Sequence, residues 1–182
     1  MDKIIIDLGT GDGRFVYKNA LKNPNNFHIG IDPSDKFNKY QKKVNRKKLT
    51  NVQFITGSIE IVPKNLPKAD EVYINLPWGS LLKIVIQPNN FPDLLKPEGL
   101  LQIIFGYHKN LEPSEAKRLD LPEISENYIK TYIIPKFEKA GFSLREFCVL
   151  EKKDLKKVET TWAKKLSFGN NRPVFKLIFK KC

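Results

Sequence analysis

The sequence predicts an α/β fold in which one seven-stranded, mostly parallel sheet carries helices on both faces. Residues 3–8 form a short, β-branched apolar run that leads directly into a glycine-rich turn, as at a strand-to-helix junction. A second apolar run follows at residues 27–32 and ends in an acidic residue, Asp32. Strand-like and helix-like patterns then alternate with short connections, which is typical of parallel sheets covered by helices.

Each element follows from the local pattern of apolar and polar residues. Strands are predicted at residues 3–8, 27–32, 52–56, 71–76, 100–107, 144–151 and 173–180. Helices are predicted near residues 13–21, 34–46, 81–86, 127–139 and 160–168. Pro135 predicts that the fourth of these helices starts or kinks there, and Gly141 ends it. The last two strands are expected to form an antiparallel edge of the sheet.

The length of 182 residues indicates one domain spanning residues 1–182, large enough to bury a core. No apolar stretch approaches the ~20 residues that cross a bilayer, and the N-terminus carries no signal-peptide pattern. The two cysteines do not make a disulfide framework. Cys148 lies in an apolar strand pattern and is predicted to be a core residue, whereas the terminal Cys182 has no assigned role. We therefore expect a cytoplasmic protein.

The net charge of +12 favours a polyanionic partner. Phe37, Tyr40 and Val44 have the spacing of a buried helical stripe, so the basic residues between them project outward. Such a face is often only solvated, but a dense cluster without acidic residues favours a phosphate-binding surface. The cluster consists of Lys36, Lys39, Lys42, Lys43, Arg46, Lys47 and Lys48.

The glycine-rich turn has the spacing of a cofactor loop. Its pattern is D-x-G-x-G-x-G, formed by Asp7, Gly9, Gly11 and Gly13. Arg14 stands where a dinucleotide loop would have its third glycine, and the pattern instead resembles the cofactor loop of class I S-adenosylmethionine methyltransferases. Glycines let backbone N–H groups approach a ligand, and Asp32 can accept hydrogen bonds from both ribose hydroxyls. We therefore predict S-adenosylmethionine; another adenosine ligand, or none, is the alternative.

Two tryptophans are candidates for contact with a substrate. Trp78 follows Pro77 at the end of the fourth strand, where parallel sheets face their ligands. An indole face can stack on a nucleobase, worth about 1–3 kcal/mol, which partly offsets the energy of flipping the base out. A core tryptophan at a loop is the alternative for Trp78.

Trp162 has a different sequence context. Leu155, Val158, Trp162 and Leu166 have near-helical spacing, so periodicity alone favours an amphipathic helix with Trp162 in the core. Basic residues around it suit phosphate contacts, namely Lys156, Lys157, Lys164, Lys165 and Arg172.

Four segments together resemble one family, the kanamycin–apramycin resistance 16S rRNA methyltransferases, which methylate N1 of a decoding-site adenine. They are residues 6–14, 30–33, 76–82 and 162–169, and the resemblance covers nearly the whole chain. The glycine loop is widely shared, whereas the Pro-Trp-Gly and Trp-Ala-Lys segments are much more specific. The resemblance implies a class I (Rossmann-like) methyltransferase fold. It also implies S-adenosyl-L-methionine as donor, S-adenosyl-L-homocysteine as product, aminoglycoside resistance, and 16S rRNA in the 30S subunit as partner. A ribosome-docking enzyme of this size is expected to be a monomer, and we expect it to bind neither DNA nor membranes.

The resemblance also implies roles for individual residues. Trp78 and Trp162 match tryptophans that clamp the flipped adenine, Pro77 holds Trp78, and Thr160 matches a hydroxyl residue near the methyl group. Cofactor contacts would fall on Asp7, Gly9, Gly11, Gly13, Asp32, Pro33, Ser58, Ile59, Glu60, Asn75, Ser80 and Leu81. Contacts with rRNA would fall on Lys42, Lys43, Arg46, Lys47, Lys48, Arg118, Lys164, Lys165 and Arg172. No metal site is expected.

The expected mechanism is direct in-line methyl transfer to adenine N1. This nitrogen keeps a free lone pair at neutral pH, so no general base is required, and neither His28 nor His108 falls in a motif. Positioning would then supply most of the catalysis. Two features depart from the family: an N-terminal hairpin usually precedes the glycine loop, and Asn170 and Asn171 stand where relatives can have basic residues.

Three other functions remain open from the sequence. Residues 75–78 resemble the Asn/Asp-Pro-Pro-aromatic motif of amino methyltransferases, which would favour adenine N6. Guanine N7 methylation of tRNA shares the fold and the basic surface. A non-catalytic RNA-binding or ribosome-assembly protein could keep the fold, and it would show no affinity for S-adenosylmethionine.

Overall fold

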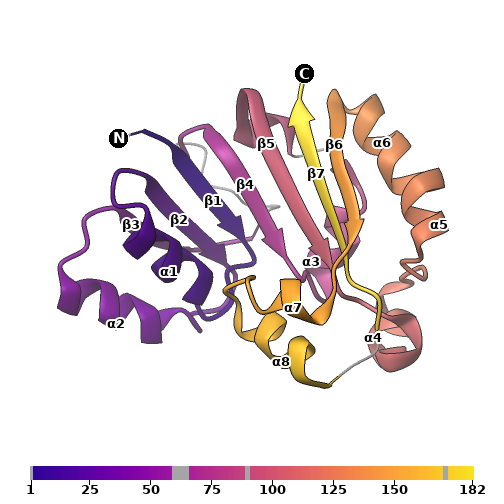
Figure 1. The fold of residues 1–182 in the computed structure, drawn as a ribbon, viewed down its shortest axis with the longest axis horizontal. Helices are drawn as coiled ribbons and strands as arrows, with labels where there is room; N and C mark the ends of the chain where they lie inside the picture. The colour runs from indigo at the N-terminus through magenta and orange to yellow at the C-terminus, as the bar shows by residue number, and fades with distance from the viewer. Residues whose placement is uncertain (1, 59–65, 89–90, 170–171) are drawn as a thin grey trace.

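The sheet has seven strands in the order β3-β2-β1-β4-β5-β7-β6 (Figure 1). The computed structural model describes residues 2–58, 66–88, 91–169 and 172–182. The first five strands pair in parallel, and β7 runs antiparallel between β5 and β6. The predicted mostly parallel sheet with an antiparallel edge is thus confirmed. The strands are β1 Ile4–Leu8, β2 Phe27–Asp32, β3 Val52–Thr56, β4 Ala69–Asn75, β5 Leu95–Phe105, β6 Phe142–Val149 and β7 Phe175–Lys181.

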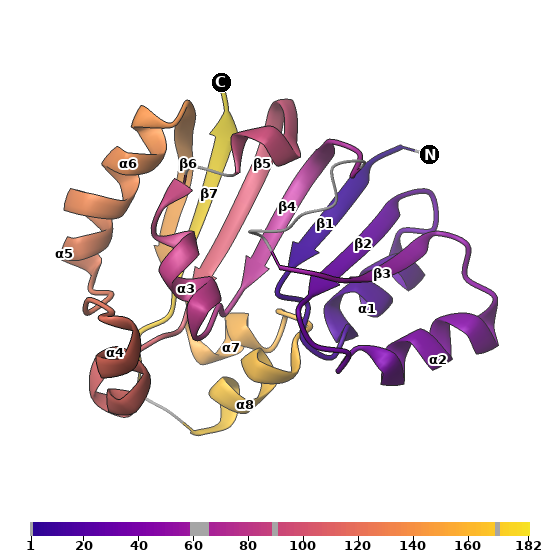
Figure 2. The ribbon, with the colours of Figure 1, turned by 180° about the vertical axis from the view of Figure 1, so that it is seen from behind.

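Helices cover both faces of the sheet, as predicted. Helix α1 lies on one face, and α3 lies with α5 and α6 on the other (Figures 1 and 2). The α-helices are α1 Arg14–Lys22, α2 Asn38–Lys47, α3 Ser80–Val85, α4 Pro113–Leu119, α5 Glu126–Tyr128, α6 Ile134–Lys139, α7 Lys152–Leu155 and α8 Thr161–Gly169. Three further turns are η3 Pro92–Leu94, η4 Lys109–Leu111 and the π-helical turn η5 Ile129–Ile133.

Several predicted boundaries shift for local reasons. Helix α2 begins at Asn38 rather than at residue 34, because Ser34 donates from both its backbone N and Oγ to Asp32 Oδ1 and forms a turn. Pro135 lies in the first turn of α6, directly after η5. Proline has no N–H for the helical ladder, and the wider π-turn accommodates it. The sequence reading missed α4 and α7.

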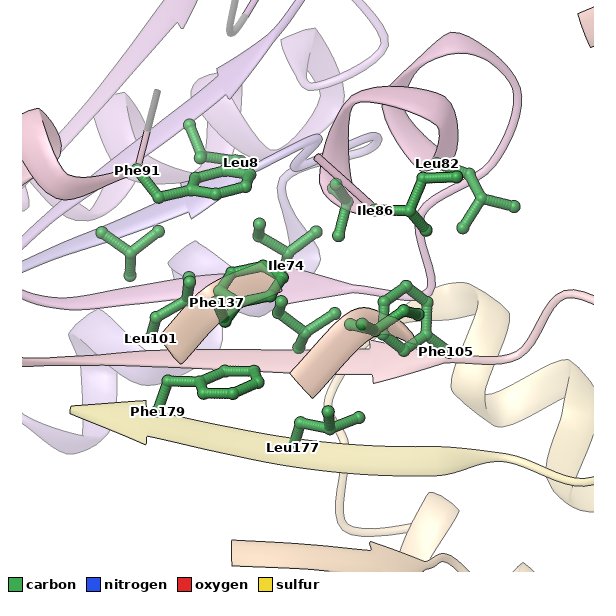
Figure 3. Packing of buried hydrophobic residues seen from close by; sticks show 14 of the residues in the cluster. Leu8, Ile74, Leu82, Ile86, Phe91, Leu101, Phe105, Phe137, Leu177 and Phe179 are labelled. Atoms are coloured by element: carbon green, nitrogen blue, oxygen red, sulfur yellow. The ribbon is translucent and has the colours of Figure 1, made fainter. Parts of the chain in front are cut away.

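The core lies between the sheet and α3, α5 and α6. Phe137 of α6 is fully buried, and its ring stacks on Phe179 of β7 at 4.4 Å and faces Phe91 at 6.0 Å between centroids (Figure 3). Cys148 was predicted to be a core residue, and this is wrong. It is only half-buried, because β6 is the edge strand of the sheet, and its Sγ lies 3.4 Å from Glu146 Oε1.

One edge of the sheet gathers the segments that the sequence marks as functional. The carboxyl ends of β1, β2, β4 and β5 point to the same edge, and α2, α8 and α4 follow that edge in both views (Figures 1 and 2). Both chain termini lie at the opposite edge. Within the described part of the chain, no helix has the length and apolar character of a membrane span. Nor do the described residues gather three or more His, Cys, Asp or Glu side chains into a possible metal site.

Candidate active site at the carboxyl edge of the sheet

The glycine turn after β1 requires glycine for steric reasons. Gly9 has φ +74°, and a Cβ there would lie 2.3 Å from Leu81 Cδ2 of α3. Gly13 has φ +78°, and a Cβ there would lie 2.6 Å from the Phe54 ring. Both glycines combine left-handed backbone with close packing, so the turn can sit directly against α3 and β3. Gly13 itself is not among the residues that line the groove described below.

Asp32 joins the glycine turn to the end of β2. Its Oδ2 accepts a hydrogen bond from the backbone N of Gly11 at 2.8 Å. Its Oδ1 accepts from the Ser34 backbone N at 2.9 Å and from Ser34 Oγ at 2.6 Å. The predicted ribose-binding carboxylate is therefore held by three donors at the edge of the groove, and its orientation is fixed before any ligand arrives.

Asp7 is a buried acid beneath the same turn. Asp7 is only 2% exposed, and Asn75 Nδ2 donates a hydrogen bond to Asp7 Oδ1 at 3.2 Å. Burial, together with the nearby charges of Asp32 and Asp12, raises the pKa of the Asp7 carboxyl to about 7, although the hydrogen bond from Asn75 opposes the rise. Asn75 Oδ1 is also buried and has no hydrogen-bond partner in the structure. A cationic ligand in the groove would favour the charged form of Asp7.

A groove of ≈ 1230 Å³ runs along this edge, and an apolar lobe of ≈ 370 Å³ adjoins it. Pro33, Ser80 and Leu81 line both spaces, and Ser58 lines the lobe. The residues fit S-adenosylmethionine, because the lobe offers an apolar slot for adenine, Asp32 an acceptor for ribose, and Asp7 an anion for a cationic group. The predicted contacts Ile59 and Glu60 lie outside the described residues.

Trp78 and Trp162 line one pocket of ≈ 290 Å³ that opens beside the groove. Trp78 is 53% exposed and Trp162 is 54% exposed. The core position that periodicity favours for Trp162 is therefore wrong. The helical pattern breaks between α7 and α8, so the stripe does not pass through Trp162. Leu155 and Leu166 of the predicted stripe are buried in one cluster, and Ala163 is buried in place of Trp162.

The loop that carries Trp78 has a strained backbone. Leu76 has φ +55°, although Pro77 follows it. Left-handed backbone costs a non-glycine residue roughly 1–2 kcal/mol, and a following proline disfavours it further. Leu76 N donates to Ile104 O at 2.8 Å, and the Leu76 side chain packs into the cluster that contains Leu166. These contacts hold the strained residue, and Pro77 is buried while Trp78 is exposed.

Thr160 lines the groove, and it also caps a helix. Its Oγ1 accepts a hydrogen bond from the backbone N of Ala163 at 3.0 Å, at the start of α8. The hydroxyl that the family resemblance places near the methyl group thus has a structural partner in this chain.

Arg172 lies in the wall of the tryptophan pocket rather than on an open basic face. Its side chain is 11% exposed, and Nη1 donates to Glu112 Oε1 at 2.8 Å and to Gly106 O at 3.0 Å. Sequence reasoning missed Glu112, because its partner is 60 positions away in the chain and no local pattern marks the pair.

The other predicted RNA contacts differ in their surroundings. Lys42, Arg46, Lys47, Lys48, Lys164 and Lys165 are exposed. Lys43 Nζ lies over the Tyr40 ring at 4.6 Å, and Lys165 Nζ lies over the Trp162 ring at 5.0 Å. Arg118 is exposed but forms a bidentate pair with Glu115 in its own helix, with distances of 3.0 and 2.7 Å.

The sheet order, the glycine turn after β1 and the acid at the end of β2 define a class I methyltransferase domain. Residues 1–180 match the family NpmA, 16S rRNA (adenine(1408)-N(1))-methyltransferase. The chain belongs to this family, and the resemblance inferred from four short segments is confirmed.

Individual relatives support the same assignment. The 16S rRNA (adenine(1408)-N(1))-methyltransferase of Escherichia coli is 36% identical over 188 residues, which cover 97% of this chain and 86% of the relative. The aminoglycoside resistance methyltransferase NpmB1 has a similar structure, with 34% identity, a TM-score of 0.82, and coverage of 100% of this chain and 88% of that chain. A variant of the enzyme from Catenulisporales acidiphilia, solved with the cosubstrate SAM, has 26% identity and a TM-score of 0.81, with coverage of 99% and 86%.

Proposed function

We propose that this protein transfers a methyl group from S-adenosylmethionine to N1 of adenine 1408 of 16S rRNA in the 30S subunit. The observation that carries the proposal is the pair of half-exposed tryptophans in one pocket, directly beside a groove with a glycine turn and a fixed carboxylate. The matched family and the Escherichia coli relative are both named for N1 of that adenine.

The groove residues divide the work of holding the cofactor. When bound, S-adenosylmethionine supplies a methyl group on a positively charged sulfur, and S-adenosylhomocysteine is the product. Pro33 and Leu81 would hold the adenine ring in the apolar lobe, and Asp32 would accept hydrogen bonds from the ribose hydroxyls. Asp7 would supply the anion for the cationic part of the molecule.

The two tryptophans would hold the target base. Stacking on an indole is worth about 1–3 kcal/mol per base, which helps to keep the adenine out of its helix. N1-methyladenine is cationic, and indole faces stabilise positive charge. No histidine is among the described residues that line the pocket and groove, which agrees with a reaction that needs no general base.

The test is methylation of purified 30S subunits with labelled S-adenosylmethionine, followed by mapping of the modified base. N1 methylation blocks Watson–Crick pairing and stops reverse transcription at adenine 1408, whereas N6 methylation does not. We expect Trp78→Ala and Trp162→Ala each to lower the rate by about 10²-fold or more, since both remove stacking and positioning. Tyr132→Ala, an exposed aromatic residue in η5, is the matched control and should leave the rate unchanged.

Two results would overturn the proposal. Unlabelled 30S subunits, despite intact binding of S-adenosylmethionine, would point to tRNA or free RNA as substrate. A label without a reverse-transcription stop would point to N6, for which the unpartnered Asn75 Oδ1 offers an acceptor.

The proposal extends to the cell. We propose a cytoplasmic monomer that binds the ribosome rather than DNA or membranes and that confers aminoglycoside resistance. Expression in a susceptible bacterium should raise the inhibitory concentrations of kanamycin and apramycin, and Trp78→Ala should abolish the increase. Gel filtration of the purified protein tests the monomer.

A further inference from the structure

Helix α8 is joined to the glycine turn by a hydrogen bond between residues 149 positions apart in the chain. Thr161 Oγ1, in the first turn of α8, donates to Asp12 Oδ2 at 2.7 Å. The other oxygen of the same carboxylate, Asp12 Oδ1, accepts from the backbone N of Arg14 at 3.2 Å, where α1 begins. Hydroxyl-to-carboxylate bonds are short and stronger than neutral ones. One carboxylate therefore fixes the starts of two helices.

A second contact joins the same two segments. Lys22 Nζ, at the end of α1, lies 3.0 Å from Glu159 Oε2, just before α8. The lysine is 62% exposed, so this pair contributes little by itself. It adds a second contact between α1 and the residues at the start of α8.

Buried side chains hold one face of α8, namely Ala163, Leu166 and Ser167. Thr161 and Trp162, in the first turn, are not among them. Trp162 is 54% exposed, so packing alone does not fix its ring. The residue on its N-terminal side is Thr161, and the Asp12 that Thr161 contacts lies between Gly11 and Gly13 and also lines the groove.

We propose that Thr161 and Asp12 are positioning residues that transmit the state of the glycine turn to Trp162. In this view, binding of the methyl donor against the glycine turn orders Asp12, and through Thr161 it orders the tryptophan that receives the target base. The proposal rests on the proposed function for the identity of that base. Thr161 acts through Trp162 and Asp12 and is not assigned a contact with the reacting atoms.

The first experiment separates positioning from binding. Thr161→Val removes the hydroxyl with little change in shape, and Thr161→Ser keeps it. Because a misplacement of about 1 Å can cost about 10²-fold, we expect Thr161→Val to lower kcat for 30S methylation about 10–100-fold. KM for S-adenosylmethionine should stay within about 3-fold, as expected for an interaction that matters in the transition state. Thr161→Ser should restore most of kcat.

Controls separate this effect from loss of any threonine hydroxyl and from unfolding. Thr131→Val is the matched control, because the Thr131 hydroxyl donates to Asn127 O at 2.8 Å on an exposed helical surface. It should leave kcat unchanged. In an Asp12→Ala background, Thr161→Val should cause no further loss, because the acceptor is already gone. Thermal unfolding of each variant shows whether it folds.

The second experiment needs no RNA. The chain has two tryptophans, so Trp78→Phe leaves Trp162 as the only indole reporter. We expect S-adenosylmethionine to reduce acrylamide quenching of Trp162 in this variant, and Thr161→Val to remove that response while the cofactor still binds. The response would persist even if 30S subunits proved not to be the substrate, so the two proposals fail separately. A quenching response that survives in Thr161→Val, or a Thr161→Ser variant as impaired as Thr161→Val, would overturn this one.

Discussion

At the scale of single residues, the start of α8 places three roles on three consecutive side chains. Thr160 caps the helix, Thr161 donates to Asp12, and Trp162 points its indole into a pocket that it shares with Trp78. These roles need different chemistry, namely a hydroxyl acceptor, a hydroxyl donor and an exposed aromatic face. The segment can therefore tolerate only conservative changes if the site is to keep its geometry.

Two substitutions of Thr160 separate its role as the cap of α8 from any role of its hydroxyl in the groove. Thr160→Ala should lower the free energy of unfolding by about 1 kcal/mol, because Ala163 N loses its acceptor. Thr160→Asn should retain that stability, since asparagine is a good N-cap, but it has no hydroxyl near the groove. Urea unfolding measures the cap, and 30S methylation measures the rest. Equal stability of Thr160→Ala and the parent would show that the Thr160 hydroxyl does not stabilise the start of α8.

Asp7 predicts an unusual dependence of stability on pH. Its pKa is raised in the folded protein to about 7, so between pH ~4 and ~7 the folded state keeps a proton that the unfolded state has lost. The free energy of unfolding therefore falls as pH rises through that window. Asp7→Asn has no carboxyl to ionise, so it escapes this loss of stability. It should be more stable than the parent above pH 7 by about 2–4 kcal/mol, and the difference should vanish near pH 4.

Urea unfolding at several pH values tests this expectation without any ligand. Asp2→Asn, at an exposed position, is the matched control and should follow the parent. Parallel stability curves for Asp7→Asn and the parent would show that burial does not raise the pKa of Asp7. Replacing a functional residue is expected to stabilise the fold where function requires that residue to hold a buried charge.

At the scale of elements, the loop after β4 and helix α8 share one packing contact. Leu76 carries the strained backbone beside Trp78, and its side chain packs into the cluster that contains Leu166 of α8. Gly106, at the end of β5, leaves room for both, because a Cβ there would lie 2.6 Å from Leu76 Cδ2 and 3.2 Å from Leu166 Cδ1. The two tryptophan-bearing segments are thus packed against each other.

Gly106→Ala tests that contact. The backbone of Gly106 is not left-handed, so the added methyl group acts only through crowding. We expect a loss of about 1–3 kcal/mol in stability, as for other overpacked sites, and slower methylation because the Leu76 loop must move. Leu76→Ala should cost less in the Gly106→Ala background than alone, since it makes room for the methyl group. Strict additivity in unfolding experiments would show that the two residues do not interact.

At the scale of the whole molecule, basic helices follow the edge of the sheet that carries the site. Helices α2, α8 and α4 lie along this edge, and α6 lies away from it (Figure 1). Exposed lysines on α2 and α8 can contact phosphates on either side of a base held in the tryptophan pocket. Such contacts fix orientation without reading sequence, so a folded RNA surface is the expected partner.

Charge reversal tests this arrangement. Lys42→Glu with Lys47→Glu on α2 should weaken 30S binding and reduce the slope of log affinity against log salt by about 1–2, because up to two phosphate contacts are lost. Lys139→Glu, an exposed change on α6, is the matched control and should leave the slope unchanged. Equal effects per reversed lysine of the α2 and α6 changes would show that only net charge matters. Binding assays over a range of salt concentrations distinguish the two.

Much of the fold was predictable because it follows from local patterns. The β-branched runs, the glycine turn and Asp32 predicted the parallel half of the sheet and the groove that it forms. The insertion of β7 between β5 and β6 was not predictable, because strand order depends on pairing between distant segments. The same limit explains why Glu112 was missed beside Arg172.

The sequence by itself determined the class of protein: its glycine spacing, its acid after β2 and its two short tryptophan segments indicated a methyltransferase of this family. Only the tertiary structure decided where Trp162 lies. Its periodicity favoured the core, but the break between α7 and α8 and the contacts of Thr160 and Thr161 leave its ring exposed beside Trp78. Local patterns record which face of a helix is apolar, whereas the position of a helix end depends on hydrogen bonds to residues far away in the chain.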